Sequence, residues 1–197
     1  MKLLVFTDIH GSTLALKRIT KKSTSADIII CCGDLTIFEQ GLYGILKKLN
    51  TIGKRVLVIP GNHENTKRLK KVSSGLSYIL FIDERFFETE KHLFFAIEGN
   101  GFSLDDKHFD KTIKKHEKKF KENKKKLILI THAPPYNTKL DKLFDGHCGN
   151  KSIRNFIIKY QPMFAFSGHI HDNFGKHDTL GTTKLLNPGP FGKIVNI

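Results

Sequence analysis

The chain has 197 residues, of which 39% are hydrophobic, and its 33 basic and 19 acidic residues give a formal net charge of +14. This length fits a single domain over residues 1–197, and the apolar fraction allows a full core to be buried. No stretch approaches the roughly 18 apolar residues of a membrane span, the N-terminal run 1–6 is too short for a signal peptide, and three cysteines do not make a disulfide framework. The composition therefore excludes a membrane-spanning protein and favours a cytoplasmic one.

Short apolar runs alternate with helix-like stretches in the first part of the chain. Runs 2–7, 27–32 and 55–59 contain many β-branched residues and are followed at once by Asp, Gly or Pro, which is typical of buried strands. Between them, apolar residues at helical spacing predict helices over 12–22 and 38–50. This alternation implies a βαβ core with right-handed crossovers.

Further strands are predicted in the second half of the chain. Three consecutive strands joined by charged turns are expected over 78–82, 85–87 and 93–97. Two more buried strands are expected over 126–131 and 163–167.

Two helices and a strand-rich tail complete the prediction. An amphipathic helix is expected over 107–124, and a last helix over 152–160 is stopped by Pro162. The tail 174–197 repeats the pattern of strands and turns. The predicted fold is α/β, a four-layer sandwich of two mixed β-sheets packed face to face and flanked by helices.

Half of the net charge lies in one segment, 107–126, which carries ten lysines against three acidic residues. Such a segment can attract nucleic acid or another polyanion, or it can be the solvated face of a helix. Phe109 and Phe120 fall on its apolar side, so it lacks a stacking platform for single-stranded bases. Both interpretations stay open at this level.

Five short motifs carry the chemistry, and each follows a predicted strand. They offer carboxylates, imidazoles and one amide oxygen, a donor set that suits divalent cations such as Mn, Fe or Zn. Ligands bind beyond the carboxyl ends of strands in α/β sheets, so these side chains are expected to converge. The motifs are Asp8-Ile9-His10, Gly33-Asp34, Gly61-Asn62-His63-Glu64, Thr131-His132-Ala133-Pro134 and Gly168-His169-Ile170-His171.

The last motif predicts a local geometry of its own. In an extended segment, the spacing of two residues would point the imidazoles of His169 and His171 the same way, while Ile170 turns into the core.

A pair of divalent metals about 3.5–4 Å apart can clamp the oxygens of a phosphoryl displacement and lower the pKa of a bound water to about 7. Two carboxylates against two such ions leave a net positive charge, which favours an anionic phosphate ester over a peptide. The motifs therefore predict hydrolysis of a phosphate ester by attack of metal-bound hydroxide.

In this order, D-x-H, G-D, G-N-H-E, T-H-A-P-P and G-H-x-H resemble the calcineurin-like metallophosphoesterase family. The resemblance spans Asp8 to His171 and implies a sandwich of two mixed sheets with two bound divalent metals. It implies that one metal is held by Asp8, His10, Asp34 and His171. It implies that the other is held by Asp34, Asn62, His132 and His169, with Asp34 bridging.

The resemblance also implies catalytic roles for Asn62 and for His63, the latter as the acid that protonates the leaving alkoxide. Many family members carry a second acidic residue shortly after the G-D motif, whereas residues 35–38 here are Leu-Thr-Ile-Phe. Local similarities around 147–149 and 168–175 resemble the small single-domain branch, which includes cyclic-nucleotide phosphodiesterase-like proteins.

The function predicted from the sequence is thus a dinuclear metal-dependent phosphoesterase that acts on a small phosphate ester or nucleotide, with diesters preferred to monoesters. Mn is the first choice of metal, and Fe, Zn, Ni, Co or Mg are alternatives. His147 and Asn137 are candidate substrate contacts. A nuclease of the same fold, a phosphomonoesterase and a non-catalytic scaffold are the alternatives. The sequence assigns no oligomeric state or protein partner.

Overall fold

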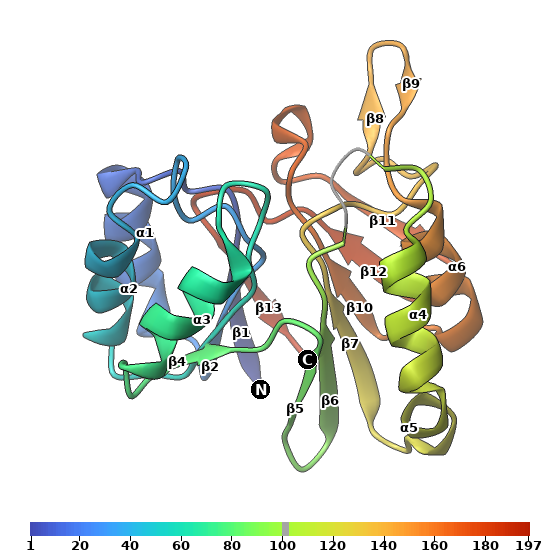
Figure 1. Cartoon of the computed structure of the whole chain (residues 1–197), viewed down its shortest axis with the longest axis horizontal. Helices are drawn as coiled ribbons and strands as arrows, with labels where there is room; N and C mark the ends of the chain where they lie inside the picture. Colours follow the sequence, from blue (N-terminus) through green and yellow to red (C-terminus); the bar gives the residue numbers. More distant parts are fainter. Residues whose placement is uncertain (100–102) are drawn as a thin grey trace.

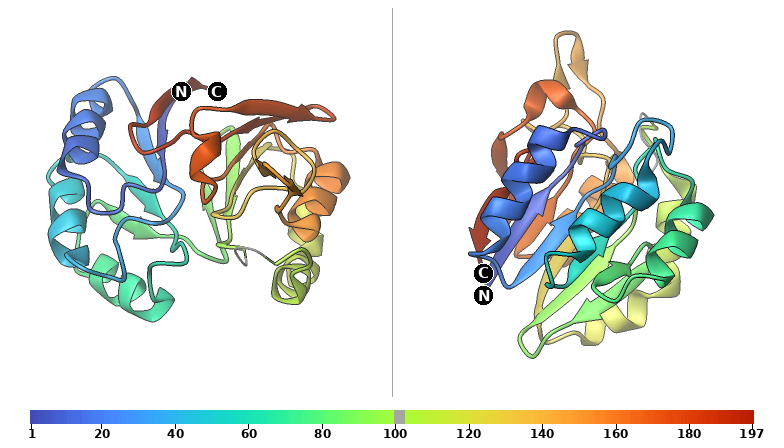
Figure 2. Two further views of the ribbon diagram at one scale, coloured as in Figure 1. Left: turned by 90° about the horizontal axis from the view of Figure 1, so that it is seen from above. Right: turned by 90° about the vertical axis from the view of Figure 1, so that its left-hand side faces the viewer.

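The computed structural model describes residues 1–99 and 103–197 and consists of four layers (Figure 1). Two large β-sheets pack face to face, and helices cover the outer face of each sheet (Figure 2). The predicted α/β sandwich of two mixed sheets flanked by helices is confirmed.

The first sheet has the strand order β13-β1-β2-β3-β4. Strands β1 to β4 run parallel, and β13 pairs antiparallel with β1. Three helices cover its outer face. The elements are β1 (Lys2–Phe6), α1 (Thr13–Ser23), β2 (Ile28–Cys31), α2 (Leu42–Asn50), β3 (Val56–Val58), α3 (Thr66–Ser74), β4 (Ile79–Phe81) and β13 (Lys193–Asn196).

The second sheet has the order β11-β12-β10-β7-β6-β5, with antiparallel edge strands β5 and β11 beside a parallel centre. Its outer face is covered by the remaining helices. The elements are β5 (Arg85–Glu88), β6 (His92–Ala96), α4 (Lys107–Lys115), α5 (Glu117–Glu122), β7 (Lys126–Ile130), α6 (Lys151–Tyr160), β10 (Phe164–Phe166), β11 (His177–Leu180) and β12 (Thr183–Leu186).

The core forms three apolar layers because side chains alternate across each strand. On β1, Leu4 and Phe6 pack under α1 to α3, whereas Leu3 and Val5 face the second sheet. Phe95 on β6 packs in the third layer, between the second sheet and α4 to α6. Among the described residues, no helix combines the length and apolar character needed to cross a membrane.

Two predicted helices differ from the structure. The helix expected over 38–50 begins only at Leu42, because Phe38 and Glu39 adopt left-handed backbone conformations and Gly41 (φ 71°) occupies the N-cap. The helix expected over 107–124 is divided into α4 and α5 at His116, whose φ of −103° and ψ of 8° are not helical. The apolar spacing persists across this break, so the sequence pattern concealed it.

Three elements were not predicted. Helix α3 has a lysine-rich sequence with Leu69 as its main buried apolar residue, and its start is fixed by Asn65, whose side chain accepts a hydrogen bond from the Arg68 amide. A small hairpin is formed by β8 (Lys142–Leu143) and β9 (Gly146–His147), and a 3-10 turn, η1, spans His171–Asn173.

Lys54 is expected to stabilise the end of α1. Its ammonium donates hydrogen bonds to the carbonyls of Ser23, Thr24 and Ala26 at 2.7, 3.0 and 2.7 Å. These carbonyls lie where helix backbone acceptors run out of internal partners. Replacing Lys54 by Met should lower the free energy of unfolding by about 1–2 kcal/mol.

Urea denaturation measures this effect, and Lys48→Met, which changes an exposed lysine of α2, is the matched control. Equal unfolding midpoints for the two variants would show that the three hydrogen bonds add nothing to stability.

Candidate metal centre

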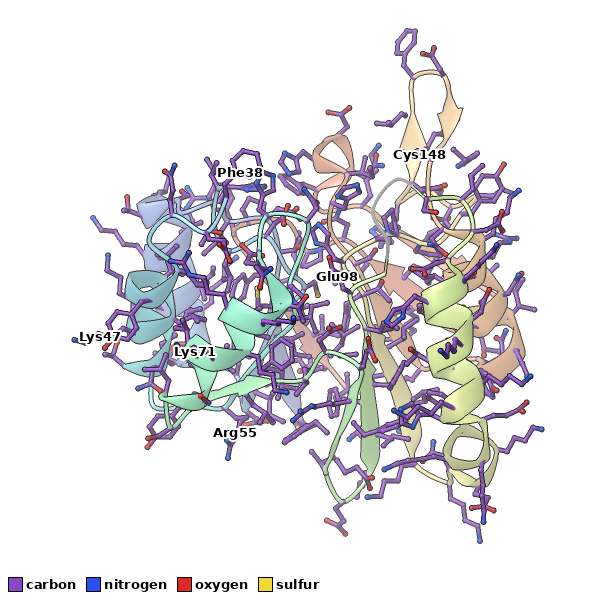
Figure 3. The ribbon with its side chains drawn as sticks, in the orientation of Figure 1. Phe38, Lys47, Arg55, Lys71, Glu98 and Cys148 are labelled. Atoms are coloured by element: carbon purple, nitrogen blue, oxygen red, sulfur yellow. The ribbon has the colours of Figure 1, made fainter. Side chains whose placement is uncertain are left out.

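The predicted site residues follow strands of both sheets. Asp8 comes after β1, Asp34 after β2 and Asn62 after β3, whereas His132 follows β7 and His169 follows β10. Because these strands run parallel within each sheet, their carboxyl ends share one edge of the sandwich. In Figure 3, the labelled Phe38 and Cys148 lie on opposite sides of this upper edge.

Four of the predicted metal ligands have an unusual backbone conformation. Asp8, His10, Asp34 and His169 have φ values of 52°, 43°, 53° and 70°, in the left-handed region that non-glycine residues rarely adopt. The strain is balanced by hydrogen bonds between the loops, such as those from the Asp8 amide to the Gly33 carbonyl and from the His10 amide to the Asp34 carbonyl, both 3.1 Å. Strained residues held by their surroundings are typical of functional sites.

One group of donors is formed by Asp8, His10 and His171. The Nε2 atoms of His10 and His171 lie 3.1 Å apart, and His171 Nε2 is 3.5 Å from Asp8 Oδ1. His10 Nδ1 lies 3.0 Å from the Thr36 carbonyl, to which it donates a proton, so the Nε2 lone pair is free to bind a cation.

A second group surrounds Asn62. Its side-chain oxygen lies 3.0 Å from both His132 Nε2 and His169 Nδ1. His132 Nδ1 donates to the carbonyl of Cys32 at 2.8 Å, which again directs Nε2 toward the centre.

Asp34 connects the two groups. Its Oδ2 atom is 3.7 Å from His10 Nε2 and 3.5 Å from His132 Nε2, while Oδ1 accepts a hydrogen bond of 3.0 Å from the His63 amide. This carboxylate therefore lies between the two sets of donors and can serve both.

His63 lies at the margin of the centre. Its ring centroid is 4.9 Å from that of His10 and 4.7 Å from that of Phe38. The Phe38 amide donates to His63 Nδ1 at 3.3 Å, so the proton of the neutral imidazole resides on Nε2.

Electrostatics in the site favour a cation. Burial opposes ionisation of Asp8 and Asp34, but hydrogen bonds and charge from His171 and His132 outweigh burial and hold the pKa of both carboxyls below the ordinary value. Burial also opposes protonation of His132, but Asp34 and Asp8 raise its pKa to about 9. The two carboxylates thus stabilise the protonated, positively charged form of His132. A divalent ion can supply this positive charge in place of the His132 proton.

His169 has the opposite tendency. Burial, together with the charge of His132, lowers the pKa of His169 to about 4, so its imidazole is neutral and ready to act as a ligand. With oxygen and imidazole donors, ionised carboxylates and backbone carbonyls that orient the rings, the residues fit a pair of divalent metals.

Glu64 connects two of the loops that carry metal ligands. Its buried carboxylate accepts hydrogen bonds from the amides of Asp34, Thr36 and Gly61 at 3.0, 2.9 and 3.1 Å, and from the Thr36 hydroxyl at 2.6 Å. Burial raises the pKa of Glu64. These bonds tie the loop after β2 to the loop after β3.

The local geometry predicted for His169 and His171 is wrong, although both side chains reach the centre. His169 has a left-handed φ and His171 begins η1, so the segment is not extended. The two imidazoles consequently meet different partners, Asn62 and Asp8, while Ile170 is buried as expected.

The candidate substrate contacts lie in a separate network around the buried Asp141. His147 Nδ1 donates a hydrogen bond to Asp141 Oδ1 at 2.8 Å, and the backbone N–H of Asn137 donates to Asp141 Oδ2 at 3.0 Å. The sequence reasoning missed Asp141 and also the carbonyls of Cys32 and Thr36 that orient two of the histidines. Backbone carbonyls leave no signal in side-chain motifs.

Comparison with known proteins gives a consistent picture. Residues 1–173 match the model of the calcineurin-like phosphoesterase family. The uncharacterized protein MJ1162 of Methanocaldococcus jannaschii is 32% identical over 96% of this chain and 88% of its own length. A probable glycerophosphodiester phosphodiesterase, GpdQ, of Arcobacter nitrofigilis is 25% identical over 83% of this chain, which spans 64% of that protein.

A solved structure shares the fold. The crystal structure of TT1561 of Thermus thermophilus superposes with a TM-score of 0.74 at 16% identity, covering 96% of this chain and 89% of that one. The match of the family model over most of the sequence, together with the converging donors, leads to one conclusion: the chain belongs to the calcineurin-like phosphoesterase family.

Proposed function

We propose that this protein is a dinuclear metal-dependent phosphodiesterase acting on a small phosphate diester. The observation that carries the proposal is the position of Asp34 Oδ2, 3.7 Å from His10 and 3.5 Å from His132, between two groups of metal-binding side chains. The first metal is assigned to Asp8, His10, Asp34 and His171, and the second to Asp34, Asn62, His132 and His169.

Divalent metals, when bound, polarise the phosphoryl group and acidify water. The protein's own residues would orient the ester and handle the proton. His63 is suited to donate from Nε2 to the departing oxygen, because the Phe38 amide occupies Nδ1. Residues 35–38 include no carboxylate, and the Phe38 backbone amide is the group that contacts Nδ1 of this ring.

Mn is the proposed metal because imidazole, carboxylate and amide donors without thiolate suit it, and Fe, Zn, Ni, Co or Mg could occupy the same ligands. The preference for diesters is supported by the name of the Arcobacter relative, a probable glycerophosphodiester phosphodiesterase.

The position of helix α5, part of the basic segment 107–126, argues against a nuclease. Helix α5 precedes β7, whose carboxyl end carries His132, so α5 lies at the opposite end of the sandwich from the centre (Figure 1). Its lysines are also largely paired, Lys119 with Glu88 and Lys121 with Glu117.

The test is hydrolysis of bis(p-nitrophenyl) phosphate and p-nitrophenyl phosphate by metal-stripped protein reloaded with Mn. Diester cleavage that needs the metal and is lost in an Asn62→Ala/His63→Ala variant is the expected result. Cleavage of the monoester alone would replace the proposal by a phosphomonoesterase. No turnover of either ester despite two bound metals would favour a non-catalytic scaffold.

A further inference from the structure

A hollow of about 420 Å³ lies between the β8–β9 hairpin and the turn η1, the turn that begins with the proposed metal ligand His171. It is lined by hairpin residues 143–148 and by Asp172, which directly follows the proposed ligand His171. The hairpin projects from the edge of the molecule that carries the centre (Figure 1).

The hollow is fixed relative to the metal ligands. The side chain of the buried Asn173, in η1, donates to the carbonyls of Leu140 and Lys142 at 2.8 and 3.1 Å, at the base of the hairpin. Asp141 adds hydrogen bonds from the Thr138 and Gly149 amides at 2.8 and 3.0 Å. The hairpin and His171 therefore belong to one hydrogen-bonded unit.

The lining combines an aromatic face with hydrogen-bond acceptors. Phe144 is fully exposed at the tip of the hairpin, so its ring is open to contact with a ligand. His147 uses Nδ1 to donate to Asp141, so in its neutral form Nε2 is an acceptor. Asp145 and Asp172 add two exposed carboxylates.

We infer that this hollow holds the alcohol that stays on phosphorus during hydrolysis, and that this alcohol is neutral or cationic and bears hydroxyl or amine groups. The inference rests on the proposed phosphodiesterase function. Carboxylates and an imidazole acceptor favour donors on the ligand and repel a second phosphate or a carboxylate. Phe144 offers a face for a planar or apolar part of the ligand.

The leaving alcohol and the retained alcohol would lie on opposite sides of the centre. His63 and Phe38 lie together on one side, where the departing oxygen takes its proton. The hairpin lies on the other side (Figure 3). Water adds to phosphorus, the bond to the leaving alcohol breaks, and the phosphate monoester of the alcohol in the hollow is the product.

The experiment uses Mn-loaded protein and four p-nitrophenyl phosphodiesters that share one leaving group. Their retained alcohols are thymidine (through its 5′ oxygen), 2-aminoethanol, ethanol and 3-hydroxypropanoate. We expect kcat/KM to be higher for the thymidine and 2-aminoethyl esters than for the ethyl ester, and lowest for the 2-carboxyethyl ester. If kcat/KM is higher for the thymidine ester, the hollow prefers a nucleoside. If it is higher for the 2-aminoethyl ester, the hollow prefers a small amino alcohol.

Two variants locate this selectivity. Phe144→Ala should lower the thymidine-to-ethyl ratio of kcat/KM by about fivefold, through loss of stacking. Asp172→Asn should lower the aminoethyl-to-ethyl ratio by about threefold, through loss of an exposed charge pair. Tyr43→Ala, which removes an exposed aromatic ring from α2, is the control and should change neither ratio.

These ratios separate the two hypotheses. If the protein cleaves all four esters with similar kcat/KM, or if the variants keep the wild-type ratios, the assignment of the hollow is wrong while the phosphodiesterase function stands. If it cleaves none of the four, the proposed function itself fails.

Discussion

Replacing Asp34 by Asn should abolish hydrolysis and remove at least one of the two metals. The carboxylate lies between His10 and His132, so both proposed metals depend on its charge. An amide keeps the shape but offers one oxygen, and its NH₂ group must face either the His63 amide, itself a donor, or a cation. We expect kcat/KM on the diester to fall by about 10³-fold or more.

Metal content by mass spectrometry, measured beside the kinetics, checks the cause. The control is Asp105→Asn, which removes an exposed carboxylate outside the centre and should keep two metals and full activity. Two tightly bound metals in the Asp34→Asn protein would contradict the bridging role, even if activity were lost.

Much of this centre could be predicted because its motifs mark strand ends. A buried strand is a short apolar run, and the polar residue that ends it is visible in the sequence, as at Phe6–Asp8 and at Ile130–His132. Parallel pairing then brings these residues to one edge without any knowledge of loop structure. The family resemblance supplied the division of the ligands between two metals.

The loops themselves could not be predicted. The sequence G-H-I-H is compatible with an extended segment, but the structure has a left-handed His169 and a 3-10 turn at His171. The reason is tertiary: the His169 amide donates to both oxygens of Asp8 at 3.2 and 3.1 Å. A contact across 161 positions of the chain leaves no local pattern.

The same limit explains the errors in the helices. Apolar residues at helical spacing suggested a helix that starts at Phe38, but the Phe38 and Glu39 amides donate hydrogen bonds to His63 Nδ1 and to the Thr36 hydroxyl. These bonds hold both residues in the loop that follows Asp34. The hairpin at residues 142–147 is too short to show alternation, and its position depends on Asn173 and Asp141. Segments that build the site are thus less predictable than segments that build the core.

Two glycine-to-alanine substitutions are expected to have opposite effects on stability. At Gly168, an added Cβ would collide with the Thr7 hydroxyl and the Asp8 carboxylate, both buried. At Gly44, in the interior of α2, an added Cβ has nothing within 4 Å. Gly168→Ala should therefore cost about 3 kcal/mol of unfolding free energy, whereas Gly44→Ala should add about 0.5–1 kcal/mol.

The effect of Gly168→Ala on activity follows from what the methyl group displaces. Asp8 Oδ1 lies 3.5 Å from His171 Nε2, so a shift of this carboxylate opens the first group of donors. We expect loss of the metal held there and a fall in diester hydrolysis of about 10²-fold or more, since displacement of a reacting geometry by 1 Å has effects of this size. Chemical denaturation, metal content and kinetics of the two alanine variants, measured together, test this. Should Gly168→Ala retain wild-type stability with both metals bound, the close approach of this backbone to Asp8 would not be a requirement of the site.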